Sequence, residues 1–284
     1  MPTGPETSRS RALVLGGGGV TGIAWEVGVL AGLQAARVDL GRADAVIGTS
    51  AGAFVGAALA GGHDLQRMFV AQSEPDAAEL PAAASQEVMS AWYEAFAAGG
   101  TDPQKVGAAM GRIAKAHPEP VPRADRRAVV HARLLSTRWP ATLRVTAIDA
   151  DTGQLHVFDA SSGVSLVDAV SASGAVPGVW PLEQFAGRAW VDGGMVSTAN
   201  ARLAAGYHRV VVIAPMPEGY GAIPGAAQDT ATMRAHAQVL LVAPDERSVA
   251  AVGPNIYDPA RRGPAAAAGR AQGAGLAAAV SEIW

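Results

Sequence analysis

The sequence predicts an α/β protein with a mostly parallel central sheet, and one pattern that occurs twice supports this prediction. Residues 11–15 form a short apolar run that ends in four glycines and precedes a helical pattern over 22–36. Residues 43–48 form a second apolar run, which ends at Gly48-Thr49-Ser50-Ala51-Gly52 and leads into an apolar helix over 51–61. Strand, glycine turn and helix in succession are typical of a parallel sheet with crossover helices.

Residues 75–140 interrupt this alternation of strands and helices. They contain helical patterns over 85–98 and 124–136, with a third that opens at Asp102-Pro103. An Asp cap followed by Pro at the first helical position is a common start of a helix. Because no strand pattern occurs here, the segment of about 75–140 is predicted to be a helical insertion or cap.

Strand patterns return after residue 140. Two alternating runs, 143–149 and 154–158, flank Asp151 and Gly153 and predict a hairpin. The remaining expected elements are a helix over 165–173, a strand over 188–194 that ends in a tight turn, and buried strands over 209–215 and 237–244. The Ala/Gly-rich segment of about 245–284 is expected to be helical near its end, with Trp284 as an anchor.

The composition limits the classes of function. Its 284 residues suffice for one large α/β domain or two small ones. Hydrophobic residues make up 49%, largely alanine, and aromatic residues only 5%, so helices should pack closely through small side chains. The net charge of −3 gives no reason to expect a nucleic-acid partner. The absence of cysteine excludes disulfides and thiolate metal sites and fits a cytoplasmic protein.

No segment suggests secretion or membrane insertion. Residues 1–10 are polar and are expected to be flexible, and the apolar stretch that follows is too short for a signal peptide. No apolar run reaches the ~18 residues of a membrane span.

Ser50 lies in a Gly-x-Ser-x-Gly pattern, the spacing of a nucleophile elbow. Gly48 and Gly52 leave room for a sharp turn with strained backbone at the serine, and the following helix directs its free N–H groups toward the serine oxygen. The alternative interpretation is a strand-to-helix loop in which Ser50 only caps the helix.

The earlier glycines admit two functions. Gly17-x-Gly19-x-x-Gly22 is the dinucleotide fingerprint of Rossmann-type proteins, but that site needs an acidic residue at the end of the second strand, and this strand ends in Gly48-Thr49-Ser50. The other function is an oxyanion hole, in which backbone N–H groups stabilise the charge that develops during acyl transfer. The amides of Gly17, Gly18 and Gly19 are the candidates. A purely structural role in close strand–helix packing is the third interpretation.

A serine nucleophile needs a base, and none of the six histidines has an obvious catalytic setting. His208 lies at the start of a predicted strand, whereas ligand sites of parallel sheets form at the carboxyl ends. Asp192 lies at the end of the strand "RAWV" and is followed by Gly193-Gly194. A carboxylate within hydrogen-bond reach can accept the serine proton directly. A simple Asp-Gly-Gly turn is the alternative interpretation.

Four segments in chain order resemble the motifs of patatin-like phospholipases: Gly17 to Gly22, Gly48 to Gly52, Ala172 to Pro177, and Asp192 to Gly194. The resemblance covers roughly residues 11–215. It implies a three-layer α/β/α hydrolase fold in one domain over 11–284.

The resemblance also implies roles for individual residues. Ser50 and Asp192 would form a catalytic dyad, Gly17, Gly18 and Gly19 the oxyanion hole, and Gly22, Gly48, Gly52, Gly193 and Gly194 would support these motifs. No metal or cofactor is needed. Many bacterial members have Arg or Lys where this chain has Thr21, a departure that bears on phospholipid preference more than on hydrolase chemistry.

The protein is therefore expected to be a serine acyl hydrolase that cleaves carboxylic esters of lipids through an acyl-enzyme. Because such substrates lie in membranes, peripheral contact of the protein with a membrane is also expected. Trp92 and Phe96, on an apolar stripe of the insertion, are candidates for lining an acyl-chain channel, although core packing explains the stripe as well. Three alternatives remain at this point: an acyltransferase with the same dyad, a non-catalytic binding module, and the Rossmann-type dinucleotide-binding protein.

Overall fold

The computed structural model describes residues 10–74, 79–117, 121–221 and 223–284. Of the N-terminal segment that was expected to be flexible, residues 1–9 lie outside the described part. The strands are β1 Arg11–Leu15, β2 Ala45–Gly48, β3 Leu143–Asp149, β4 Leu155–Phe158, β5 Glu183–Phe185, β6 Arg188–Asp192, β7 Arg209–Ile213 and β8 Gln238–Val242. The α-helices are α1 Gly19–Ala35, α2 Ala51–Ala60, α3 Leu65–Ala71, α4 Gln86–Gly99, α5 Pro103–Ala116, α6 Arg123–Arg133, α7 Leu166–Ser173, α8 Ala226–Ala231, α9 Glu246–Val252 and α10 Arg262–Ile283.

All strands belong to one mixed sheet whose hydrogen-bonded neighbours follow the order β5-β6-β3-β2-β1-β7-β8, with β4 paired to β3 as well. The pairs β3–β2, β2–β1, β1–β7 and β7–β8 are parallel. The pairs β3–β4, β3–β6 and β5–β6 are antiparallel. The predicted mostly parallel sheet is confirmed. The loops after β1 and β2 lie close to the point where the strand order reverses, which is where open α/β sheets form ligand sites.

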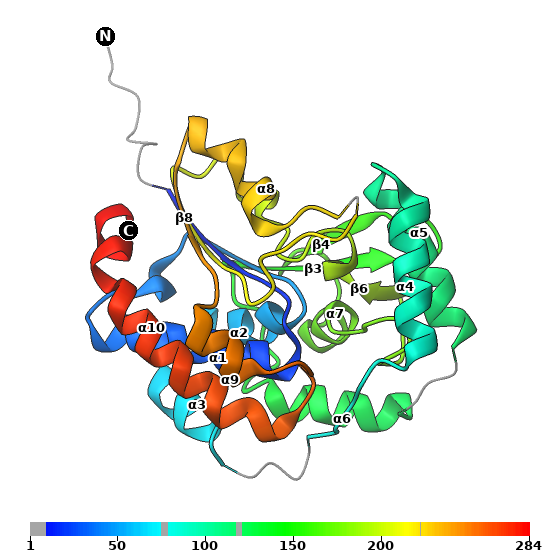
Figure 1. The fold of residues 1–284 in the computed structure, drawn as a ribbon, viewed down its shortest axis with the longest axis horizontal. Coiled ribbons are helices and arrows are strands. Elements are labelled where there is room, and N and C mark those ends of the chain that lie inside the picture. Colours follow the sequence, from blue (N-terminus) through cyan, green and yellow to red (C-terminus); the bar gives the residue numbers. More distant parts are fainter. Residues whose placement is uncertain (1–9, 75–78, 118–120, 222) are drawn as a thin grey trace.

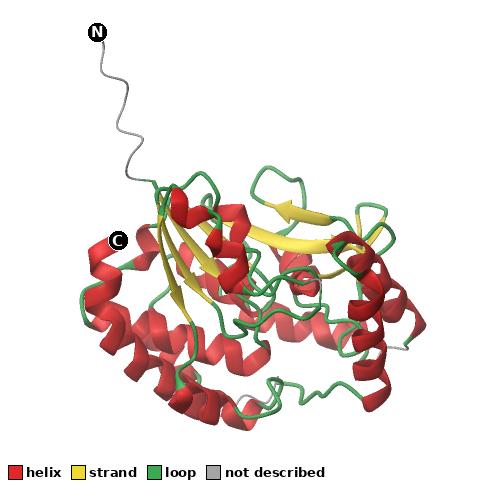
Figure 2. Ribbon diagram, turned by 45° about the horizontal axis from the view of Figure 1, so that its top comes forward, coloured by secondary structure: helices red, strands yellow, loops and turns green. Residues whose placement is uncertain are grey.

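Helices cover both faces of the sheet, giving three layers (Figures 1 and 2). Side chains of β1 alternate between the faces: Leu13 and Leu15 pack in a large core with α1, α2 and α10, whereas Ala12 and Val14 pack in a smaller core that includes Ala226 of α8. The helices α4 and α5 pack against each other at one side of the molecule (Figure 1). The fold class predicted from the sequence is therefore present.

The helices α1 and α10 approach each other closely because glycines face their contact. A Cβ atom on Gly28 would lie 2.1 Å from the carbonyl oxygen of Ala266, and one on Gly273 would lie 2.2 Å from that of Val29. The close packing that the alanine-rich composition predicts is confirmed here. Trp284 also anchors the chain end, since its indole N–H donates to the carbonyl of Asp39 at 2.9 Å.

The three helices predicted within 75–140 are α4, α5 and α6, and Asp102 caps α5 through the amides of Gln104 and Lys105. Several boundaries differ: α1 begins at Gly19 rather than at residue 22, and β2 begins at residue 45. The elements α3, β5, α8 and α9 are short, with seven residues or fewer each, and the sequence patterns did not predict them individually.

Candidate active site

Ser50 lies at a strained turn between β2 and α2. Its backbone has φ 53° and ψ −115°, a region that L-residues rarely adopt, so the strain predicted for an elbow serine is present. Both flanking glycines are sterically required: a Cβ on Gly48 would lie 2.6 Å from the Cα of Ala53, and one on Gly52 would lie 2.1 Å from the carbonyl oxygen of Leu15. This geometry presents the hydroxyl group of Ser50 at the carboxyl end of β2.

Buried hydrogen bonds hold the turn in place. The amide of Ser50 donates to Ser173 Oγ on α7 at 2.8 Å. Thr49 Oγ1 lies 2.8 Å from Thr146 Oγ1 on β3, and Asn200 Nδ2 donates to Thr49 Oγ1 at 3.1 Å. Asn200 Nδ2 also donates to the carbonyl of Gly193 at 3.1 Å, so one side chain connects the elbow to the turn after β6. The sequence motifs contained Ser173 without a role, and no sequence signal identified Asn200.

Asp192 lies beside the elbow, but the reason differs from the one that the sequence suggested. The sequence argument assigned it to the carboxyl end of a strand as in a parallel sheet, whereas β6 runs antiparallel to β3. Because β4 occupies the other edge of β3, β2 and β6 follow one another along the same edge: Gly48 pairs with Val145, and Asp192 with Ala147. Asp192 is thus positioned just beyond the end of β2, where Ser50 lies.

Burial controls the charge of Asp192. The side chain is 2% exposed, and this desolvation raises the pKa of the carboxyl from 3.8 to about 7. A hydrogen bond from the Ser50 side chain, the Gly194 amide at 2.7 Å and the charge of Arg126 all act in the opposite direction and lower that pKa. A carboxyl group with a pKa near neutrality, in contact with a serine hydroxyl, is suited to accept and return a proton.

The glycine-rich loop borders Ser50. A Cβ on Gly17 would lie 3.5 Å from the Cβ of Ser50, so the loop backbone comes close to the serine. The amide of Gly17, however, donates to the carbonyl of Thr198 at 2.9 Å, and it is therefore already engaged, which the sequence could not reveal. Among the described residues, the amides of Gly18, Gly19 and Ala51 have no hydrogen-bond partner. These three amides are the free donors beside Ser50.

Thr21, at the position where the sequence departs from the family pattern, is fully buried. Its amide and its hydroxyl both donate to the carbonyl of Ile256, at 3.1 and 3.2 Å. Thr21 therefore ties the start of α1 to the chain near residue 256, a segment that also borders the site.

The six histidines, all within the described part of the chain, do not line either cavity that contains Ser50. His208 lies just before β7 and is hydrogen-bonded to Ser10 Oγ at 3.0 Å. His156 packs its ring against Trp190, with the ring centres 4.9 Å apart. In the same part of the chain, no group of three acidic or histidine side chains could hold a metal ion.

A cavity of about 500 Å³ opens at Ser50 and Asp192. Its walls are mainly apolar and include Trp92 and Phe96 of α4, the two candidates from the sequence. Trp92 is fixed by a hydrogen bond from its indole N–H to the carbonyl of Pro177 at 3.1 Å, and Phe96 stacks on Tyr220 with ring centres 5.9 Å apart. Two further lining residues, Tyr93 and Met89, are exposed by 67% and 40%. The arrangement can accommodate an extended apolar chain next to the serine.

Within the described ranges, we found no helix of the length and apolar character that crossing a bilayer requires.

The solved structures to which this chain is similar include those of two longer proteins. VipD from Legionella pneumophila has 15% identity, with 74% of this chain and 50% of that chain covered and a TM-score of 0.40. The type III effector protein ExoU has 17% identity, with 96% of this chain and 53% of that chain covered and a TM-score of 0.41. This chain spans about half the length of each.

The model of the patatin-like phospholipase family matches residues 13–205, well over half of the chain. This range contains the glycine-rich loop, Ser50, Ser173 and Asp192, so the four sequence motifs and the geometry around Ser50 lie within the matched region. The chain therefore belongs to the patatin-like phospholipase family.

Proposed function

We propose that this protein is a serine acyl hydrolase of lipid esters that uses Ser50 as nucleophile and Asp192 as its only proton acceptor. Membership of the patatin-like phospholipase family supports the general assignment of the protein as a lipid hydrolase. The observation that carries the finer proposal is the contact between the strained Ser50 and the buried carboxyl of Asp192, whose pKa is raised to about 7.

The proposed reaction follows from these positions. Ser50 Oγ attacks the ester carbonyl while its proton passes to the Asp192 carboxylate. The negative charge on the former carbonyl oxygen is held by the free amides of Gly18 and Gly19, a contribution typically worth ~10²–10³ in rate for one donor. Collapse of the intermediate expels the alcohol, which takes the proton from Asp192 and leaves an acyl group on Ser50. Water then attacks the acyl-enzyme and gives a proton to Asp192; when the second intermediate collapses, this proton passes to Ser50 Oγ and the fatty acid is released.

The apolar cavity supports a lipid substrate. An acyl chain held against Trp92 and Phe96 would present its ester to Ser50. The exposed side chains of Met89 and Tyr93 at this cavity suit contact with a lipid surface, so that the chain could pass from the surface into the cavity. The cavity is also lined by residues 254–257, beyond the family match, and we therefore propose that residues 11–284 act as one hydrolase domain.

The test is fatty-acid release from a lysophospholipid by the purified protein and by four variants. Ser50→Ala and Asp192→Asn should each remove nearly all activity while retaining the wild-type circular dichroism spectrum. The control variants His208→Ala and His236→Ala should stay within about tenfold of wild type, because a general base is typically worth ~10²–10⁴ in rate. A thousandfold loss in a histidine variant, with only a weakened Asp192→Asn, would instead indicate a Ser–His–Asp triad.

The same dyad could also catalyse acyl transfer to an alcohol. An assay with an added alcohol distinguishes the two reactions by their products. Free fatty acid as the main product in the presence of a candidate acceptor, such as glycerol, supports a hydrolase. A dominant transacylated product would assign the protein to the acyltransferases.

A further inference from the structure

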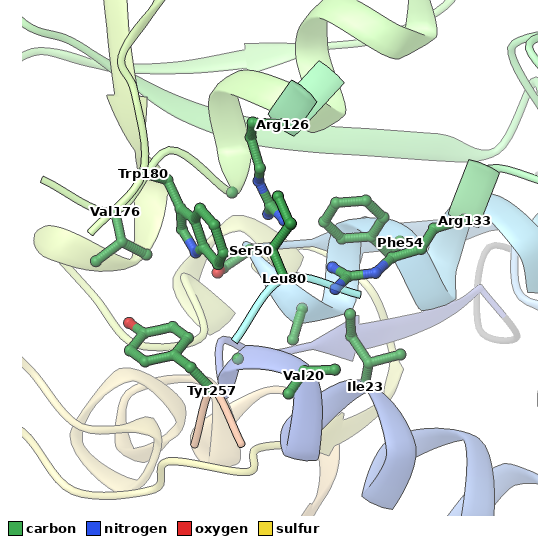
Figure 3. A pocket seen from close by; sticks show the side chains of 13 residues that line it. Val20, Ile23, Ser50, Phe54, Leu80, Arg126, Arg133, Val176, Trp180 and Tyr257 are labelled. Atoms are coloured by element: carbon green, nitrogen blue, oxygen red, sulfur yellow. The ribbon is translucent and has the colours of Figure 1, made fainter. Parts of the chain in front are cut away.

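A second, much narrower pocket borders Ser50. Its volume is about 20 Å³, and its lining includes Ser50, Phe54, Arg126, Arg133, Trp180 and Tyr257 (Figure 3). It shares Gly19, Ser50, Val176 and Tyr257 with the apolar cavity. It shares Val20, Ile23, Phe54 and Arg133 with a third cavity of about 450 Å³. This small pocket, called the constriction below, therefore lies between the two larger cavities, next to the serine.

Arg126 of α6 reaches into this constriction, as Figure 3 shows. Its side chain is held against Trp180, with Cζ 4.0 Å from the ring centre, and the residue is only 6% exposed. The atom Nη1 is buried and has no hydrogen-bond partner among the described residues. Burial of a guanidinium with an unpaired N–H donor costs folding free energy, and a bound hydrogen-bond acceptor would offset this cost.

The neighbouring arginines differ from Arg126 because each of them forms an ion pair with a carboxylate. Arg133, which also points into the pocket (Figure 3), forms an ion pair with the buried Glu79, with Nε and Oε1 2.8 Å apart. On α6 itself, Arg123 and Arg127 both bind Glu183. Asp192 lies near enough to act on the charge of Arg126, but burial keeps much of that carboxyl protonated near pH 7. Among the described residues that line this pocket, Arg126 is thus the positive charge without a matching anion.

We infer that Arg126 is a specificity residue that binds an anionic oxygen of the substrate, the phosphate of a phospholipid head group. This inference rests on the proposed function of Ser50. The constriction has room for about one oxygen-sized group, since a cavity needs roughly 10–15 Å³ to hold a water molecule. The phosphate oxygen would bind Arg126 there, and the rest of the lysophospholipid, with its acyl chain, would lie in the 500 Å³ cavity.

The charge state of Arg126 agrees with this role. Burial and the charge of Arg133 lower its pKa to about 9, so the guanidinium remains mainly protonated at neutral pH. Removal of a buried charged hydrogen-bond partner typically lowers binding roughly ten- to hundredfold.

The test compares two esters that differ in the phosphate, 1-palmitoylglycerol and 1-palmitoyl lysophosphatidylcholine, in the same mixed micelles. Arg126→Gln should lower kcat/KM for the lysophospholipid by about ten- to hundredfold more than for the neutral ester. Arg126→Lys should recover part of the loss, and the matched control Arg127→Gln, one residue along α6, should leave the ratio of the two substrates unchanged. The ratio cancels any effect on Asp192, because that effect is common to both esters.

A binding experiment is independent of turnover. Glycerol 3-phosphate should bind Ser50→Ala, measured by calorimetry, and the binding should vanish in the Ser50→Ala/Arg126→Gln double variant. Binding of inorganic phosphate with equal affinity would assign the site to a free anion and overturn the head-group inference. An equal loss of kcat/KM on both esters would overturn it as well and leave Arg126 as a structural residue. Failure of the proposed function would look different, since Ser50→Ala would then retain hydrolysis.

Discussion

Replacement of Asp192 by Asn should inactivate the protein and at the same time stabilise it at neutral and alkaline pH. The carboxyl is 2% exposed and its pKa rises from 3.8 to about 7, chiefly by desolvation. A raised carboxyl pKa means that the folded state binds a proton more tightly than the unfolded state does. Its stabilising contribution is therefore complete below pH 3.8 and is lost as the pH rises through 7.

The size of the effect follows from the shift of about three pKa units, each worth about 1.4 kcal/mol. Well above pH 7 the ionised carboxylate costs roughly 4 kcal/mol of folding free energy, and at pH 5 less than half of this cost applies. Asn is neutral, nearly isosteric, and keeps an acceptor oxygen for the Gly194 amide. The variant should thus gain roughly 4 kcal/mol over wild type at pH 8 and less than half of that at pH 5.

Urea unfolding of both proteins at pH 5 and pH 8, followed by circular dichroism, measures this difference. A variant that is destabilised by the same amount at both pH values would refute the reasoning, because the carboxylate would then be well stabilised by its hydrogen bonds. The expected result would also make Asp192 an example of a buried group retained for activity at a cost in stability.

The remaining predictions concern the metal, the acyl cavity, the elbow and the helix contact. Hydrolysis of p-nitrophenyl esters should persist in EDTA; activity that a divalent ion alone restores would contradict this. Trp92→Ala should lower kcat/KM more for long acyl esters than for acetate, because the side chain lines the cavity, whereas an equal loss with a lowered Tm would indicate core packing alone. Ser173→Ala removes the acceptor of the Ser50 amide and should lower kcat with KM nearly unchanged. Gly28→Val should destabilise by about 3 kcal/mol through overpacking against Ala266, while the control Gly275→Ala, which meets open space, should not.

The strained serine turn could be predicted from the sequence because local chemistry determines it. Gly-x-Ser-x-Gly between an apolar strand and an apolar helix specifies the turn, and its φ of 53° at Ser50 agrees. The helix starts at Asp102-Pro103 and Ser165 follow from the same kind of local signal, since each cap bonds amides within three residues.

Features that depend on distant partners could not be predicted in this way. A strand pattern in the sequence is the same for parallel and antiparallel pairing, so the antiparallel direction of β6 was not predicted. Asp192 nevertheless lies beside Ser50 in the structure. The engaged amide of Gly17 depends on Thr198, far along the chain. In the sequence, Arg126 resembles its neighbours on an arginine-rich helix; the structure distinguishes it by its packing against Trp180 and by its Nη1, which is unpaired within the described part of the chain.

Labelling of the protein with a fluorophosphonate, followed by mass spectrometry of the peptides, tests the Ser50–Asp192 dyad most directly. The label should be found on Ser50, its rate should fall with a single ionisation near pH 7 on the acidic side, and Asp192→Asn should abolish it. His208→Ala and His236→Ala should label at nearly the wild-type rate. Labelling at another residue, or loss of labelling in a histidine variant while Asp192→Asn still reacts, would contradict the dyad.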